Sequence, residues 1–245
     1  RTGSSGGTYT ISPVVTNGPT IIAAASNNSA GRITIASNTA AGTYTISYQL
    51  SGEGTCAATT TLKVVETPTV TNVTSPSAIC SGGTATITAA SITGTGTSYN
   101  VYNAASGGTL LGTVPYTTPV LTNSGSTDII VNYYVEAVSG CASTSRFTVP
   151  VTVKPLPTLS AITGTGPLCV GSSATYGNSQ AGGTWTSSNS FVASINSTSG
   201  LVNALSAGPT TITYSYTNGA GCTNTVSYNL VVNAQPSVSS ITGNN

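Results

Sequence analysis

Five cysteines are the side chains in this sequence most able to do chemistry, because thiols form disulfides, bind metals or act as nucleophiles. They are Cys56, Cys80, Cys141, Cys169 and Cys222. Zinc is disfavoured, because the sequence has no CxxC pair and no histidine. The lack of histidine also excludes a catalytic triad built on imidazole. We therefore expect disulfides, which place the chain in an oxidising location outside the cell or in a periplasm.

The carboxylates are too few and too scattered for a catalytic or calcium site. They are Glu53, Glu66, Asp128 and Glu136. A calcium cage needs about six to eight oxygen ligands, and a glycosidase needs two carboxyl groups within about 5–10 Å. Only Asp128 and Glu136 share a segment, where eight strand residues separate them by about 26 Å. We therefore expect no enzyme, no cofactor, no metal, and no catalytic or cofactor-binding residue.

Two other residues, Lys63 and Trp185, could have a chemical role, but a structural role is favoured for each. Lys63 could form an isopeptide bond with an asparagine, but lysines near the ends of closing strands, such as Lys63 and Lys154, more often discourage edge-to-edge aggregation. Trp185 could stack on a sugar, but its alternating segment favours packing in a core.

The composition favours strands over helices and disfavours nucleic acid as a partner. Only 4% of the residues are charged and the net charge is +1, whereas a soluble domain carries roughly 25% charged residues and a nucleic-acid binder a basic patch. The sequence has 46 Thr, 35 Ser and 12 Tyr, while common helix formers are scarce. Its longest apolar run, residues 21–25, is far too short to span a membrane.

A repeat organises the sequence. Three segments end with an alternating strand, a glycine-containing turn with Cys56, Cys141 or Cys222, a second alternating strand and a proline. These prolines, Pro68, Pro157 and Pro236, also begin similar opening segments, two of which lead to Cys80 and Cys169. The prolines are 89 and 79 residues apart, which is the size of a small β-sandwich module.

The repeat suggests a pairing of the cysteines. One opening and one closing cysteine fall in each full repeat, so we expect Cys80 to pair with Cys141 and Cys169 with Cys222. Each bridge would contribute about 4 kcal/mol. Cys56 would stay unpaired within this sequence. Bridges across the linkers, Cys56–Cys80 and Cys141–Cys169, remain an alternative.

The third repeat resembles a known family. Its segments Trp185-Thr186-Ser187-Ser188-Asn189, Val192-Ala193-Ser194-Ile195 and Gly200-Leu201-Val202 resemble the bacterial Ig-like group 2 domain. The second repeat, with Tyr133-Tyr134-Val135-Glu136-Ala137, resembles Ig-like modules of large secreted Bacteroidetes proteins. The whole chain is similar to stretches of giant surface adhesins, including those of gliding motility. This resemblance implies type IX secretion and a place on the cell surface, and it carries over no catalytic residue and no ligand.

Together these observations predict an all-β chain of tandem Ig-like antiparallel β-sandwich modules, arranged as an elongated rod of roughly 110–120 Å. The expected domains are an incomplete module at 1–67, modules at 68–156 and 157–235, and the start of a further module at 236–245. We expect the array to continue beyond both ends.

The expected function is a structural stalk or fibre segment of a secreted, repetitive cell-surface adhesin that serves attachment or gliding. Its expected partners are neighbouring modules of the same longer chain, with surface polysaccharide or a substratum as candidates, and self-association is plausible at so low a charge. We expect no nucleic acid and no membrane span. One alternative is a glycan- or surface-binding module, favoured if Tyr99, Tyr102 and Tyr116 gather on one exposed side. The other is a self-assembling filament subunit.

Overall fold

The computed structural model describes residues 7–14, 18–21, 33–36, 38–50, 57–89 and 92–237. Within these residues the regular structure consists of β-strands, and no α-helix occurs. This confirms the all-β fold expected from the abundance of β-branched residues and the scarcity of helix formers. None of the described residues forms a helix long and apolar enough to cross a membrane.

The chain packs into two compact units. The first consists of Arg1–Ser75, Ile87–Tyr116 and Asn132–Val149, and the second of Pro76–Thr86, Thr117–Val131 and Pro150–Asn245. This division does not follow the module boundaries expected from the repeat, at 67/68, 156/157 and 235/236. Those boundaries stay predictions.

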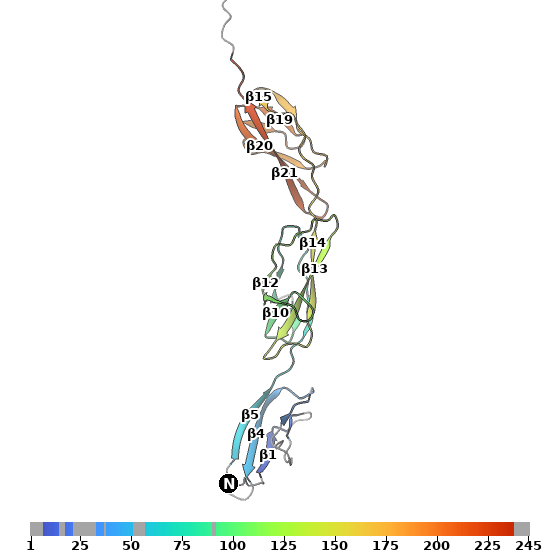
Figure 1. Ribbon diagram of the computed structural model, residues 1–245, viewed down its shortest axis with the longest axis vertical. Coiled ribbons are helices and arrows are strands. Elements are labelled where there is room, and N and C mark those ends of the chain that lie inside the picture. Colours follow the sequence, from blue (N-terminus) through green and yellow to red (C-terminus); the bar gives the residue numbers. More distant parts are fainter. Residues whose placement is uncertain are drawn as a thin grey trace, which may run out of the picture. The chain divides into compact units, whose positions relative to one another are not determined.

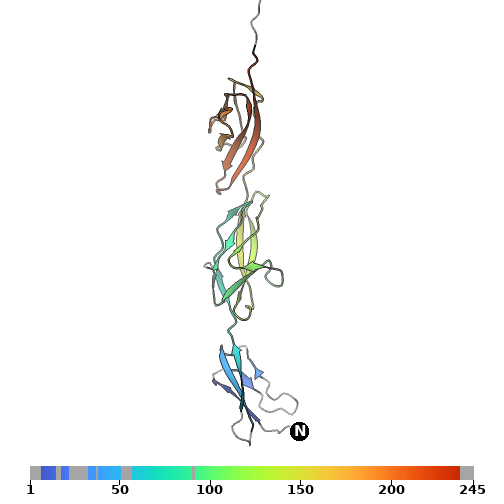
Figure 2. The same ribbon diagram turned by 90° about the vertical axis from the view of Figure 1, so that its left-hand side faces the viewer.

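The N-terminal sheet of the first unit has three antiparallel strands in the order β1-β4-β5. They are β1 (Gly7–Ser12), β4 (Gly42–Leu50) and β5 (Ala57–Val64), and a short pair joins β2 (Thr20–Ile21) to β3 (Ile33–Thr34). Strands β4 and β5 lie side by side in both views (Figures 1 and 2). Tyr44 and Ile46 are buried on one face of β4, as a period of two residues requires.

A five-stranded sheet follows in the order β11-β10-β13-β14-β7. Its strands are β11 (Leu110–Thr113), β10 (Ser98–Tyr102), β13 (Ile129–Val138), β14 (Phe147–Lys154) and β7 (Ile79–Cys80). Two short pairs accompany it, β12 (Tyr116–Thr117) with β8 (Thr86–Ile87) and β6 (Val70–Val73) with β9 (Ile92–Gly94). Every second residue of β14 is buried, namely Val149, Val151 and Val153. The alternating pattern of the sequence therefore marks the strand's inward face.

The C-terminal part of the second unit is a β-sandwich. One sheet has the order β15-β21-β20-β17 and the other β16-β19-β18. The strands are β15 (Leu168–Cys169), β16 (Ser173–Thr175), β17 (Thr184–Ser187), β18 (Ala193–Ile195), β19 (Leu201–Ala204), β20 (Gly208–Thr217) and β21 (Thr223–Asn233). Trp185, Ile212 and Leu230 of the first sheet share one apolar core with Ala193 and Val202 of the second. Figure 1 shows β20 and β21 as the long neighbouring strands of this sandwich.

The expectation of purely antiparallel sheets is wrong at two edges. Strand β7 runs parallel to β14, and β15 runs parallel to β21. Both edge strands are two residues long. Alternation identifies which residues of a strand face inward, but so short a segment carries no signal for its direction. The direction follows from the point at which the connecting chain reaches the sheet edge.

Candidate functional site

The most definite chemistry among the described residues is a disulfide between Cys80 and Cys222. Their Cα atoms are 5.5 Å apart, and 142 positions separate them in the sequence. Cys80 ends β7 and lies opposite Lys154, the last residue of β14. Cys222 is fully buried in the turn before β21. The bond thus joins the opening of one sequence repeat to the closing hairpin of the next, and we call this region the joint.

The expected pairs Cys80–Cys141 and Cys169–Cys222 are therefore wrong, and for the second pair strand geometry explains why. Cys169 lies opposite Asn233, at the end of β21, whereas Cys222 directly precedes the start of that strand. Eleven residues form β21, so these two cysteines are separated by roughly 34 Å along it. A disulfide needs Cα atoms within about 7 Å.

Of the cysteines in the described residues, Cys141 and Cys169 do not pair across their linker either. Cys141 and Cys169 are free thiols. Cys141 is half-buried, and its Sγ lies 3.7 Å from the carbonyl oxygen of Glu66. Cys169 is exposed. Cys56 lies outside the described residues, and the alternative bridge from Cys56 to Cys80 is excluded because Cys80 is already bonded.

Hydrogen bonds between the linker and the hairpin reinforce the joint. Asn218 Nδ2 donates to the carbonyl oxygen of Pro155 at 3.3 Å, and Asn224 Nδ2 donates to that of Pro157 at 2.9 Å. Lys154 was expected to be a solvated edge residue, but its Nζ donates to the carbonyl oxygen of Ala220 at 3.2 Å. The linker prolines lack N–H groups, so their carbonyl groups provide the attachment.

Asn218 also shapes the turn that presents Cys222. Its Oδ1 accepts the N–H groups of Ala220 at 3.1 Å and Cys222 at 2.9 Å. Neither Asn218 nor Asn224 was predicted from the sequence to have a role. The dipeptide Asn218-Gly219 is a signal for a tight turn and could have identified Asn218, whereas nothing in the sequence distinguishes Asn224.

A second polar cluster, also missed from the sequence, surrounds Arg146 in the first unit. Its guanidinium carbon lies 3.4 Å from the centre of the Tyr102 ring, and its Nε lies 3.5 Å from Oε1 of Glu136. Arg146 Nη1 donates to the carbonyl oxygens of Ala104 at 2.8 Å and Gly107 at 2.6 Å. Tyr102 in turn donates to Oε2 of Glu136 at 2.9 Å. Every group in the cluster is thus partnered within the protein, which is typical of a structural role.

The acidic residues do not form a site in the described part of the chain. Asp128 is exposed beside β13, Glu136 is bound to Arg146, and Glu66 follows the end of β5. Glu53 lies outside the described residues. Within the described ranges, no group of three or more His, Cys, Asp or Glu side chains could hold a metal ion.

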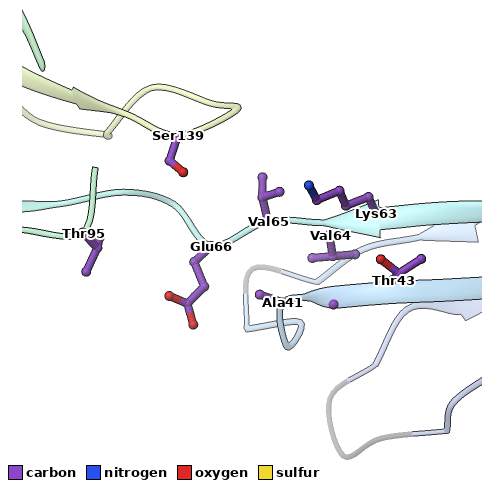
Figure 3. A pocket seen from close by; sticks show the side chains of 9 residues that line it. Ala41, Thr43, Lys63, Val64, Val65, Glu66, Thr95 and Ser139 are labelled. Atoms are coloured by element: carbon purple, nitrogen blue, oxygen red, sulfur yellow. The ribbon is translucent and has the colours of Figure 1, made fainter. Parts of the chain in front are cut away.

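An open hollow of about 420 Å³ lies beside the end of β5 (Figure 3). Its lining includes Lys63, Glu66, Thr95 and Ser139. Figure 3 shows the Lys63 and Glu66 side chains pointing to opposite sides of the chain. The two charged groups therefore do not converge on a common ligand position, as the polar groups of a binding pocket do.

The aromatic residues considered for sugar binding are buried or half-buried. Trp185 is 5% exposed and packs against Tyr214, with ring centres 4.6 Å apart and ring planes tilted by 46°. It belongs to the core of the sandwich, as its alternating segment predicted. Tyr99, Tyr102 and Tyr116 are all half-buried. None of these three tyrosines is fully exposed, so they do not form the exposed cluster that would favour a binding module.

Comparisons with known proteins agree with this fold. Residues 66–155 match the family model "Ig-like domain CHU_C associated", and residues 147–227 match "Bacterial Ig-like domain (group 2)". No curated protein matches the chain.

Several solved structures are similar at low identity. Mouse cadherin-23 EC22–24 is 14% identical, with 94% of this chain and 86% of that chain covered and a TM-score of 0.29. Human CDH23 EC21–23 is 13% identical, with coverage of 92% and 88% and a TM-score of 0.30. Sidekick-1 immunoglobulin domains 1–5 are 14% identical, with coverage of 94% and 52% and a TM-score of 0.33. At these identities and TM-scores, the similarity indicates no function for this chain.

The family matches fall on consecutive parts of the chain and agree with its all-β architecture. Modules of this kind are typically structural and not enzymatic, and together with the disulfide they fit an extracellular domain. The chain carries tandem bacterial Ig-like modules.

Proposed function

We propose that this chain is a structural segment, a stalk or fibre, of a repetitive secreted adhesin on a cell surface. Neighbouring modules of the same longer chain are its direct partners. The segment presents a binding domain at a distance and transmits force between that domain and the cell during attachment or gliding.

The observation that carries this proposal is the position of the Cys80–Cys222 bond in the chain. Tension applied to the two ends must pass through residues 80 and 222, which the disulfide connects directly. The residues between them therefore lie outside the covalent path of the force. A disulfide that keeps the intervening residues from being stretched suits a segment that must keep its length under load.

Single-molecule stretching of the chain, held at its two termini, tests the mechanical role. Without reductant, we expect the contour length to lack the contribution of the 142-residue separation between Cys80 and Cys222. Adding a reductant releases about 500 Å, at roughly 3.3–3.6 Å per residue. Cys222→Ser is expected to extend fully without reductant, whereas Cys169→Ser, which removes a free thiol, behaves like the parent. Equal contour lengths with and without reductant contradict the proposal.

Binding to glycans distinguishes the stalk from the alternative function, a glycan- or surface-binding module. The burial of Trp185 and the partial burial of the three tyrosines favour the stalk. We expect the folded chain to show no saturable binding to a panel of immobilised surface polysaccharides. Saturable binding that is lost on unfolding contradicts the stalk and assigns a binding role.

Self-association is the remaining alternative. Little charge repulsion opposes lateral contact at a net charge of +1. With its free thiols alkylated, a stalk segment is expected to sediment as a monomer, whereas a filament subunit forms species that grow with concentration.

A further inference from the structure

The free thiol of Cys169 occupies the same structural position as the bonded Cys80. Cys80 ends β7, which runs parallel to β14 with Cys80 opposite Lys154. Cys169 ends β15, which runs parallel to β21 with Cys169 opposite Asn233. In both cases the cysteine lies opposite the last residue of the closing strand.

The turns after the two cysteines also match. Ser81 N–H donates to the carbonyl oxygen of Lys154 at 2.8 Å, and Val170 N–H donates to that of Asn233 at 2.9 Å. The next residues are Gly82 and Gly171, with φ of 89° and 85°. This left-handed conformation favours glycine. The backbone that presents each thiol is therefore built in the same way.

After each site, the chain reaches a proline at the same distance from the end of the closing strand. Lys154 is followed three residues later by Pro157, and Asn233 is followed three residues later by Pro236. At the first site this linker leads to the module whose hairpin cysteine, Cys222, bonds Cys80. At the second site the corresponding thiol, Cys169, is exposed and unbonded.

We propose that Cys169 is the attachment site for the hairpin cysteine of a further Ig-like module that follows Pro236. The bond reproduces the Cys80–Cys222 joint one repeat later, so that every opening cysteine is joined to the closing hairpin of the following module. The inference rests on the predicted start of a further module at residues 236–245, and not on the adhesin function.

The bond forms by thiol–disulfide exchange with an oxidant that is itself a disulfide, such as glutathione disulfide. The Cys169 thiolate attacks the oxidant, forms a mixed disulfide and releases one thiol. The thiolate of the incoming hairpin cysteine then attacks Sγ of Cys169 and releases the second thiol. Two protein thiols lose two electrons and two protons, and the oxidant is reduced to two thiols.

Cys141 of the same chain is not the partner, because it already occupies a hairpin position of its own. Gly140 and Gly221 precede Cys141 and Cys222 and have φ of 76° and 83°. Cys141 lies against the carbonyl oxygen of Glu66, near the end of β5. It therefore corresponds to Cys222 and not to Cys80.

The test uses the chain extended by one module: a second copy of residues 157–245, in which the copied Cys169 is replaced by Ser, follows Gln235. The extended chain is refolded in a glutathione redox buffer, alkylated and mapped by non-reducing peptide analysis. We expect one more disulfide than in the 245-residue chain, linking Cys169 to the cysteine of the added hairpin, and the loss of Cys169 alkylation. The Cys80–Cys222 bond in the same sample is the internal reference.

Two controls complete the test. Cys169→Ser in the extended chain is expected to abolish only the new bond. The proposal is overturned if Cys169 stays fully alkylated beside a folded added module. The 245-residue chain gives an independent result that needs no extension: after oxidation Cys169 must be free of any bond to Cys141 or Cys222, and finding either bond overturns the proposal.

Discussion

Arg146 makes several stabilising contacts at once in a chain that has few charged residues. It stacks on Tyr102, pairs with Glu136 and holds two carbonyl groups of the loop before β11. The side chains of Arg146 and Glu136 are only 12% and 13% exposed. We predict that Arg146→Met lowers the free energy of unfolding by about 3 kcal/mol, because a nearly buried carboxylate loses its charge partner. Urea denaturation followed by circular dichroism measures the change.

Two further variants separate the charge of Arg146 from its shape. Arg146→Lys keeps the charge but loses the planar group that stacks and donates twice, so an intermediate loss is expected. Adding Glu136→Gln to Arg146→Met should recover part of the stability, because no charge is then left unpaired. A stability for Arg146→Met within about 0.5 kcal/mol of the parent, the range of ordinary surface substitutions, would show that the cluster is dispensable.

On the scale of a strand, β20 places chemically identical residues in opposite environments. Thr210 is 5% exposed, and its Oγ1 accepts the N–H of Asn189 at 3.1 Å and lies 2.9 Å from Oγ of Ser187. Thr213 is on the other face, where its Oγ1 lies 3.0 Å from Oγ of Ser227. We predict that Thr210→Val costs about 1–3 kcal/mol, because buried partners are left unsatisfied. The matched Thr213→Val should change stability by less than about 0.5 kcal/mol, and equal effects in thermal unfolding would contradict this assignment.

The long strands could be predicted from the sequence, whereas the disulfide partner of Cys80 could not. Period-2 alternation identified the long strands, including β4, β13 and β20, and placed Cys141 and Cys222 in turns between strands. It could not identify the partner of Cys80, because that depends on which strand ends meet at the joint. Four cysteines allow three connectivities, and spacing alone does not choose among them. The Arg146 cluster was missed for a similar reason, since stacking on Tyr102 is a tertiary contact without a local signal.

For the molecule as a whole, the shortage of ionisable groups predicts a stability that is insensitive to pH. The chain has no histidine, four acidic residues and five basic ones, and the ordinary pKa values of carboxyl, thiol and lysine groups lie outside the range from about 5 to 8. We expect the midpoint of thermal unfolding to stay nearly constant across that range. Melting curves at intervals of one pH unit measure it, and a steep titration between these limits would contradict the expectation.

Above that range, one tyrosine makes the stability of the second unit fall. Burial raises the pKa of Tyr176 above its ordinary value of 10.0, and the charge of nearby Tyr228 raises it further. The folded state therefore holds this proton more tightly than the unfolded state. Its contribution is complete below pH 10 and is lost as the pH rises through the folded pKa. We predict a falling unfolding midpoint above pH 10 and a shallower fall for Tyr176→Phe.

The slope of the unfolding midpoint against pH, and not the midpoint at any single pH, tests the role of the Tyr176 pKa. Tyr176 also donates to the carbonyl oxygen of Thr165 at 2.7 Å, so Tyr176→Phe should lose about 1 kcal/mol at every pH. Only the difference between neutral and alkaline midpoints reports the pKa. Tyr216→Phe, at a half-buried tyrosine of β20 in the same unit, controls for the general effect of removing a phenol. If both variants keep the slope of the parent chain, the alkaline loss belongs to other groups and Tyr176 is only a packing residue.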